Sequence, residues 1–213
     1  MSNRSRRVLL SPVVVLVLGN AAARISGHLW GVWSWIPVIL VYWSTLAAIL
    51  GFAGGWTSFR RWLQPSQGAW GWHLLSFATT ALLIPVLCLN FRSLNQPWVI
   101  SSWLALAIID PWLEEGHWRG LLMDAASRWP GWIAIAYTTV WFGLSHPLLL
   151  AAGGQRQGTF GSTGLLRHSF HGHDLIRGLL ENPQLAVAIF SHRVVDLLSV
   201  SVLVSLNRAV LGK

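Results

Sequence analysis

Length, composition and charge exclude an ordinary soluble protein. The chain has 213 residues, of which 54% are hydrophobic and 10% are charged, against roughly 25% charged residues in a typical soluble domain. Its mean hydropathy is +0.53 and it has one cysteine, Cys88, so a disordered chain and a disulfide scaffold are excluded as well. We therefore predict a single membrane domain, residues 1–213, whose surface is mostly covered by lipid.

Six apolar segments are predicted to cross the membrane, which requires about 20 residues each. In chain order they are 8–23, 29–53, 70–91, 98–123, 132–150 and 185–206. The first also resembles a signal peptide, but we favour a retained helix, because a polytopic protein needs no cleavage to insert. The Gly-rich segment 151–183 is predicted to be a long loop. The predicted fold is an all-α transmembrane bundle of six spans, with a seventh if part of that loop enters the membrane.

The formal net charge of +8 is interpreted as contact with the lipid bilayer. The arginines lie in short segments between apolar runs, where they mark cytoplasmic ends and meet anionic headgroups. No basic stretch interleaved with aromatic residues is present, so we predict no nucleic acid partner. Many of the fifteen tryptophans lie near the ends of apolar segments, as rings at a membrane–water interface do. We expect a multi-pass protein of a bacterial inner (plasma) membrane.

Ionisable side chains inside apolar segments are costly, and they are functional candidates by default. The fourth segment carries Asp110, Glu114, Glu115, His117 and Arg119. Glu115 and Arg119 are four residues apart, so they share a helical face and can form an ion pair. Glu114 lies about 100° further round the helix and lacks that partner, which suits a general acid or base. A charged helix end at the headgroup level is the alternative.

Two later segments carry further ionisable residues. His146 follows Phe142 by four residues, and a histidine there could be either functional or a hydrogen-bonded interior residue. His192 and Asp196 are four residues apart on one helical face. An intramembrane pair of this kind lets the carboxylate orient the imidazole and set its tautomer. Three such groups on three crossings that can converge indicate a functional site.

These residues resemble the motifs of a known family. In order along the chain they read Glu114-Glu115-x-x-x-Arg119, Phe142-x-x-x-His146 and His192-x-x-x-Asp196. The ordered set is similar to the three motifs of the CPBP intramembrane proteases, the family of the CAAX-type prenyl-protein endopeptidases and the bacterial Abi proteins. The resemblance covers residues 98–206, a predicted protease core, whereas 8–97 are predicted to be variable N-terminal helices.

The resemblance implies a role for each motif residue. The first glutamate and the second-motif histidine of the family are held to activate a water molecule, here Glu114 and His146. The second glutamate and the arginine form a supporting pair, here Glu115 and Arg119.

The third motif is held to stabilise the tetrahedral intermediate, a role that the resemblance gives to His192 and Asp196. An ionised Asp196 cannot donate a hydrogen bond, so it is either protonated or acts through His192. Two histidines and a glutamate could also bind zinc. We favour a mechanism without a metal or other cofactor, because the ligands would come from three separate helices.

Two features depart from the family. His117 stands where apolar residues are usual, on the same helical face as Asp110 and Glu114. Pro111 could kink the helix just before the glutamates. The loop also carries His168, His171 and His173, which we expect to be solvated or to face headgroups.

We therefore predict an endopeptidase that cleaves a membrane-associated peptide or a protein C-terminal signal. The alternative is a non-catalytic membrane protein, an immunity or scaffold factor, that binds a peptide in the same cavity. A transporter that relays protons through its buried charges is a third reading.

Overall fold

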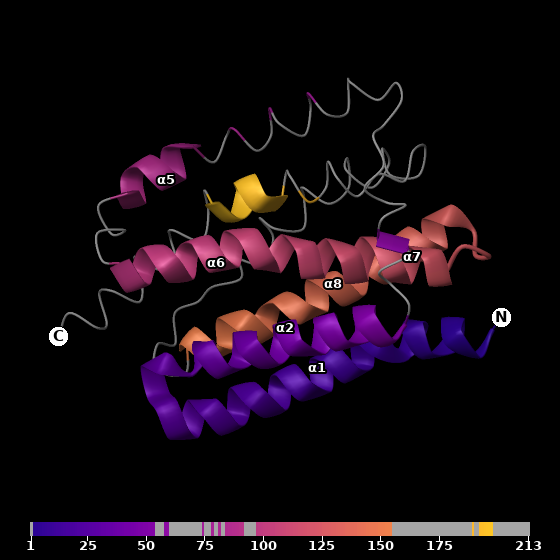
Figure 1. The fold of residues 1–213 in the computed structure, drawn as a ribbon, viewed down its shortest axis with the longest axis horizontal. Coiled ribbons are helices and arrows are strands. Elements are labelled where there is room, and N and C mark those ends of the chain that lie inside the picture. Colours follow the sequence, from indigo (N-terminus) through magenta and orange to yellow (C-terminus); the bar gives the residue numbers. More distant parts are fainter. Residues whose placement is uncertain are drawn as a thin grey trace.

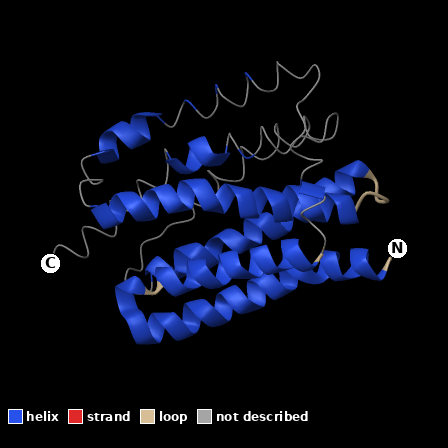
Figure 2. Cartoon of the chain, in the orientation of Figure 1, coloured by secondary structure: helices blue, strands red, loops and turns tan. Residues whose placement is uncertain are grey.

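The computed structural model describes residues 2–53, 58–59, 74, 78, 81, 84–91, 97–154, 189 and 192–197, with only the backbone for 32, 86, 90, 99 and 146–154. All regular structure within these ranges is helical and no strand occurs there, as Figure 2 shows. The all-α prediction is confirmed for this part of the chain. Half of the predicted segment 70–91, most of 185–206 and nearly all of the loop 151–183 lie outside the described residues.

Among the described residues, two helices, α1 (Asn3–Trp30) and α2 (Trp35–Phe52), are long and apolar enough to cross a membrane. They form an antiparallel hairpin (Figure 1). The turn between them is at Gly31, whose φ of 53° lies in the left-handed region that glycine adopts without steric cost. The short 3₁₀ helix η1 (Gly31–Trp33) follows this turn. Residues 24–30 therefore extend the first helix, and the second begins at Trp35 rather than at residue 29.

The predicted fourth segment forms a single continuous rod of three helices. α6 (Pro97–Glu114) passes into the π-helix η3 (Glu115–Leu121) and then into α7 (Leu122–Ala125). The π-helical hydrogen bonding is shown by the backbone N–H of Leu122, which donates to the carbonyl of His117 five residues earlier. Pro111 lies inside α6, so the change of helix type comes after it. Isolated π-helical turns occur frequently at functional sites.

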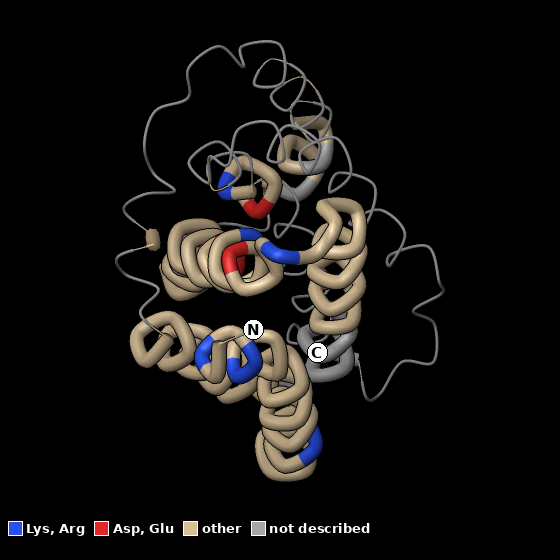
Figure 3. Tube along the Cα trace, turned by 90° about the vertical axis from the view of Figure 1, so that its right-hand side faces the viewer, with Lys and Arg blue, Asp and Glu red and all other residues tan. Residues whose placement is uncertain are grey.

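The bundle is completed by α8 (Gly131–Gly154), which lies between α6 and the hairpin in Figure 1, and by the short helix α5 (Ile84–Asn90). α1 packs against α2, α7 and α8, and η3 packs against α2, α7 and α8. The core side chains are Val15, Leu46, Trp118, Leu121 and Leu122. Figure 3 shows how few charged residues the described helices carry. The outer faces of α1 and α2 expose Val17, Leu40 and Phe52, which suits contact with lipid.

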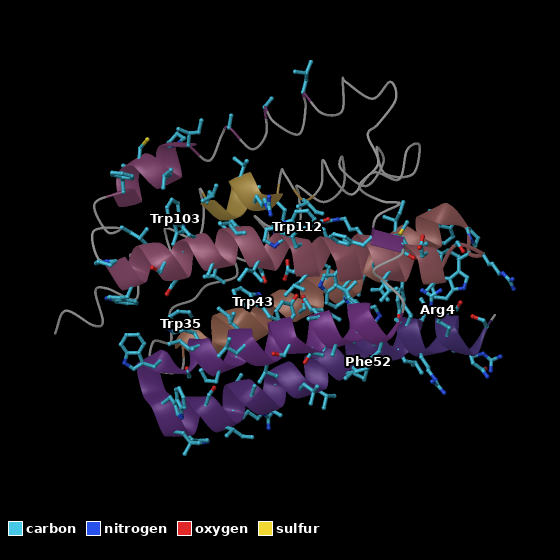
Figure 4. All side chains as sticks on the ribbon, in the orientation of Figure 1. Arg4, Trp35, Trp43, Phe52, Trp103 and Trp112 are labelled. Carbon is cyan, nitrogen blue, oxygen red and sulfur yellow. The ribbon has the colours of Figure 1, made fainter. Side chains whose placement is uncertain are left out.

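The helical segment 192–197, yellow in Figure 1, lies against α6. The indole of Trp103 donates a hydrogen bond to the carbonyl of Leu197 (3.1 Å). The guanidinium of Arg193 lies 4.7 Å from the ring centroid of Trp112. Figure 4 labels both tryptophans on the side of α6 that faces this segment. These two contacts hold the third motif beside the first.

Candidate active site

The structure brings together five of the six predicted site residues. They are Glu114, Glu115, Arg119, His192 and Asp196. The first three lie at the end of α6 and in η3, and the last two lie in segment 192–197. Both glutamates and Asp196 are buried, with exposed fractions of 1%, 0% and 7%. Their charges therefore require partners within the protein.

Glu114 receives its partner from α2, which the three motifs do not include. The hydroxyl of Tyr42 donates to Glu114 Oε1 at 2.5 Å. The indole of Trp118, one turn after Glu114, donates to the oxygen of Tyr42 at 3.2 Å. All three side chains are buried. One oxygen of the Glu114 carboxylate is therefore held by a chain of two hydrogen bonds that links α2 to η3.

Glu115 forms the predicted ion pair with Arg119 and has a second partner in the third motif. Arg119 Nη1 donates to Glu115 Oε1, and His192 Nδ1 lies 2.7 Å from the same oxygen. An ionised carboxylate only accepts hydrogen bonds, so Nδ1 of His192 carries a proton and donates it to Glu115. The pair thus fixes the tautomer of His192, in the way carboxylates commonly orient a functional imidazole.

This orientation turns the other nitrogen of His192 towards two carboxylates. Nε2 lies 3.5 Å from Glu114 Oε2 and 3.7 Å from Asp196 Oδ1. When the imidazole is neutral, Nε2 is an acceptor, and when it is protonated, Nε2 is a donor between two anions. Asp196 Oδ2 has no hydrogen-bond partner among the described residues. The site therefore presents hydrogen-bonding atoms of both kinds close together.

The second motif reaches this site through Phe142 of α8. Its ring centroid lies 6.2 Å from those of Trp118 and His192, and the guanidinium of Arg119 lies 5.0 Å from it. The backbone places His146 one helical turn further along α8, but its side chain lies outside the described residues. Its predicted role in activating water stays a prediction.

Two further polar contacts join the N-terminal hairpin to the motif helix. Trp43 of α2, labelled in Figure 4, donates its indole N–H to Asp110 Oδ1 at 2.6 Å. Ser11 of α1 lies 2.8 Å from His117 Nε2 and donates its hydroxyl proton to the carbonyl of Val8 at 2.6 Å. Since a hydroxyl has one proton, Ser11 accepts from His117. His117, which departs from the family motif, therefore has a hydrogen-bond partner in α1.

Sequence reasoning missed Ser11, Tyr42 and Trp43. A signal was present for two of them: Tyr42 and Trp43 are adjacent aromatic residues with polar groups, inside a segment without charge, and such groups seek partners when buried. Ser11 precedes Pro12, which has no backbone N–H and so leaves the carbonyl of Val8 without its helical donor. The Ser11 hydroxyl takes that donor's place. The sequence indicates that Ser11 can satisfy this carbonyl, but it does not indicate the contact with His117.

No group of three or more histidine, cysteine, aspartate or glutamate side chains among those described is arranged to hold a metal ion. The zinc alternative requires His146, whose side chain is not among them. The loop histidines also lie outside the described residues. The expectation of a mechanism without a metal therefore remains a prediction.

Comparison with known proteins agrees with the motifs. Residues 96–198 match the family described as Rce1-like type II CAAX prenyl endopeptidases, a segment just under half of the chain that contains all three motifs. No curated protein and no solved structure matches the chain. The resemblance of residues 96–198 to the CAAX and CPBP proteases is thus confirmed, and the match to this family implies a protease that acts on a membrane-associated protein substrate.

Proposed function

We propose that this protein is an intramembrane endopeptidase of a bacterial inner membrane that hydrolyses a peptide bond in a membrane-associated peptide or a protein C-terminal signal. The observation that carries the proposal is the placement of Glu114 Oε2 at 3.5 Å from His192 Nε2, inside a family-matched segment. A buried carboxylate beside an imidazole is the pair of groups that a hydrolytic water requires.

In the proposed reaction, Glu114, helped by His146, takes a proton from water as the water oxygen attacks the peptide carbonyl carbon. The carbonyl oxygen becomes an oxyanion, which the protonated Nε2 of His192 stabilises as a donor. The C–N bond then breaks, and the amine leaves with the proton held by Glu114. Asp196 acts through His192, 3.7 Å away, by orienting the imidazole.

Glu114→Gln tests this proposal because it keeps the size of the side chain but removes the base. Purified protein in proteoliposomes would be offered a fluorescence-quenched peptide with a farnesylated Cys-aliphatic-aliphatic-X tail, and the same peptide without the lipid. We expect cleavage of at least one by the native protein and a loss of about 100-fold or more in the variant. Asp124→Asn on α7, outside the site, is the matched control. Equal cleavage by Glu114→Gln would overturn the proposal, and retained biological function in that variant would favour the peptide-binding alternative.

The same assay distinguishes metal-independent activation of water by Glu114 and His146 from a zinc-dependent reaction. We favour the former, so cleavage should survive dialysis against a strong chelator. Loss of cleavage that added Zn²⁺ restores would establish the zinc alternative, because a zinc-bound water is an equally competent nucleophile.

A further inference from the structure

We propose that Tyr42 is a positioning residue that holds Glu114 Oε1 and thereby leaves Oε2 as the oxygen that accepts the proton from water. This inference rests on the proposed function, and it deepens it by assigning the base to one atom. It concerns a residue of α2 that lies outside the segment 96–198 matched by the family.

The direction of each hydrogen bond follows from the chemistry of the groups. The indole of Trp118 can only donate, so the oxygen of Tyr42 accepts from it at 3.2 Å. The single hydroxyl proton of Tyr42 is then free to point at Glu114 Oε1, 2.5 Å away. Trp118 therefore orients the hydroxyl of Tyr42 towards the carboxylate.

Burial makes this arrangement hard to replace. Tyr42 is 3% exposed, and Trp118 and Glu114 are each 1% exposed. If the hydroxyl of Tyr42 were absent, bulk water could not readily take its place, and the carboxylate would be free to rotate. With the hydroxyl present, Oε1 is engaged and Oε2 faces His192 Nε2.

The neighbouring glutamate, Glu115, also has one carboxylate oxygen engaged by a hydrogen-bond donor. Glu115 is held by Arg119, four residues later, through a direct ion pair. Glu114 Oε1 is held instead by the hydroxyl of Tyr42 from α2, and Trp118, also four residues later, donates to the oxygen of that hydroxyl. Each glutamate thus has one carboxylate oxygen engaged by a donor, which comes from the next turn for Glu115 and from α2 for Glu114. The difference is that Arg119 keeps Glu115 charged and engaged, whereas the neutral tyrosine leaves Glu114 able to exchange a proton.

Tyr42→Phe removes the hydroxyl and keeps the ring. We expect kcat on the quenched peptide to fall about 10- to 100-fold, because the base is no longer aimed, with KM changed by less than about twofold, because no substrate contact is lost. Tyr137→Phe is the matched control: its hydroxyl donates to the carbonyl of Leu9, away from Glu114, and kcat should be unchanged. Unchanged kcat in Tyr42→Phe would overturn the assignment.

Trp118→Phe provides a second variant if Tyr42→Phe folds poorly. It leaves the Tyr42 hydroxyl in place but removes the N–H that orients it, so kcat should fall in the same direction by a smaller factor, about 3- to 10-fold. The melting temperature in detergent shows whether each variant is folded. A folded Trp118→Phe protein with native kcat would contradict the orienting role.

Labelling of Glu114 by dicyclohexylcarbodiimide, which reacts with protonated carboxyl groups, tests the inference without substrate. Without the Tyr42 hydroxyl, Glu114 Oε1 is no longer engaged and is open to the reagent, so mass spectrometry should find labelling of Glu114 at least about threefold faster in Tyr42→Phe, with Tyr137→Phe unchanged. An equal rate would overturn the contact itself. If the native protein cleaves neither peptide but the labelling rates differ as expected, the proposed function fails while the Tyr42–Glu114 contact stands.

Discussion

The motif segment and the N-terminal hairpin contribute to the candidate site in different ways. Residues 96–198 supply the acidic and basic side chains that the structure places at the site. The hairpin of α1 and α2 supplies groups that stay neutral: the hydroxyls of Ser11 and Tyr42 and the indole of Trp43. Each of these contacts an ionisable residue of the motif helix. The hairpin therefore does not carry the proposed chemistry, but it holds the groups that do.

This division follows from the cost of burying charge. A carboxylate away from water needs hydrogen-bond donors. A cation paired directly with that carboxylate would satisfy it as well, but it would also make the carboxylate a weaker base. A hydroxyl or indole donor satisfies the carboxylate while leaving it available for a proton. Because such donors carry no charge, a motif search overlooks them, although they decide which way a carboxylate points.

The largest effect should follow loss of the histidines in the motif region. We expect His192→Ala and His146→Ala each to reduce cleavage about 100-fold or more, with the amount of folded protein in the membrane unchanged. Quantitative immunoblotting beside the peptide assay separates the two quantities. If either variant keeps native activity, the role implied for that residue by the family resemblance is wrong.

Breaking the supporting pair should lower stability as well as activity. Glu115→Ala leaves Arg119 without its partner, and Arg119→Ala leaves a fully buried carboxylate with His192 alone. A buried charge left in this way costs about 3–5 kcal/mol. The double variant should be more stable than either single one, which thermal melts in detergent would measure. A double variant that is less stable than both would mean that the pair does not act as a unit.

The sequence predicted the helical class and the convergence of the first and third motifs, because charges within apolar segments are easily recognised. The Glu115–Arg119 pair was predicted from a spacing of four residues, and the two side chains form an ion pair although η3 is a π-helix. The π-helix itself was not predictable, since it involves close packing of η3 against α2, where a Cβ on Gly116 would lie 3.4 Å from the side chain of Leu50. The partners Ser11 and Tyr42 were also missed, because contacts across more than 70 residues leave no periodic pattern.

A smaller effect is expected where the hairpin contacts Asp110. Trp43→Phe removes the N–H that donates to Asp110 Oδ1 at 2.6 Å. A carboxyl oxygen left without its hydrogen-bond donor inside the protein costs about 1–3 kcal/mol, so the melting temperature in detergent should fall. Trp35→Phe, on the same helix, is the control, because its ring packs beside the Ala23 and Val38 cluster instead. Equal losses in both variants would assign the effect to ring size rather than to the hydrogen bond.

The smallest effect concerns Ser11 and His117, the contact that most directly joins the two regions. Ser11→Ala should leave the Nε2 proton of a fully buried His117 without an acceptor, whereas His117→Leu removes the donor and restores the apolar residue usual in the family. The loss in the double variant should therefore be smaller than the sum of the single losses by about 1 kcal/mol, the net contribution of one neutral hydrogen bond. Ser101→Ala, which removes an exposed hydroxyl on α6, should change stability little. Purely additive losses would mean that α1 is held against the motif helix by apolar packing alone, and His117 would then need another explanation. A positive coupling would show instead that the polar side chain at 117 matches a serine in a helix that the family match does not include.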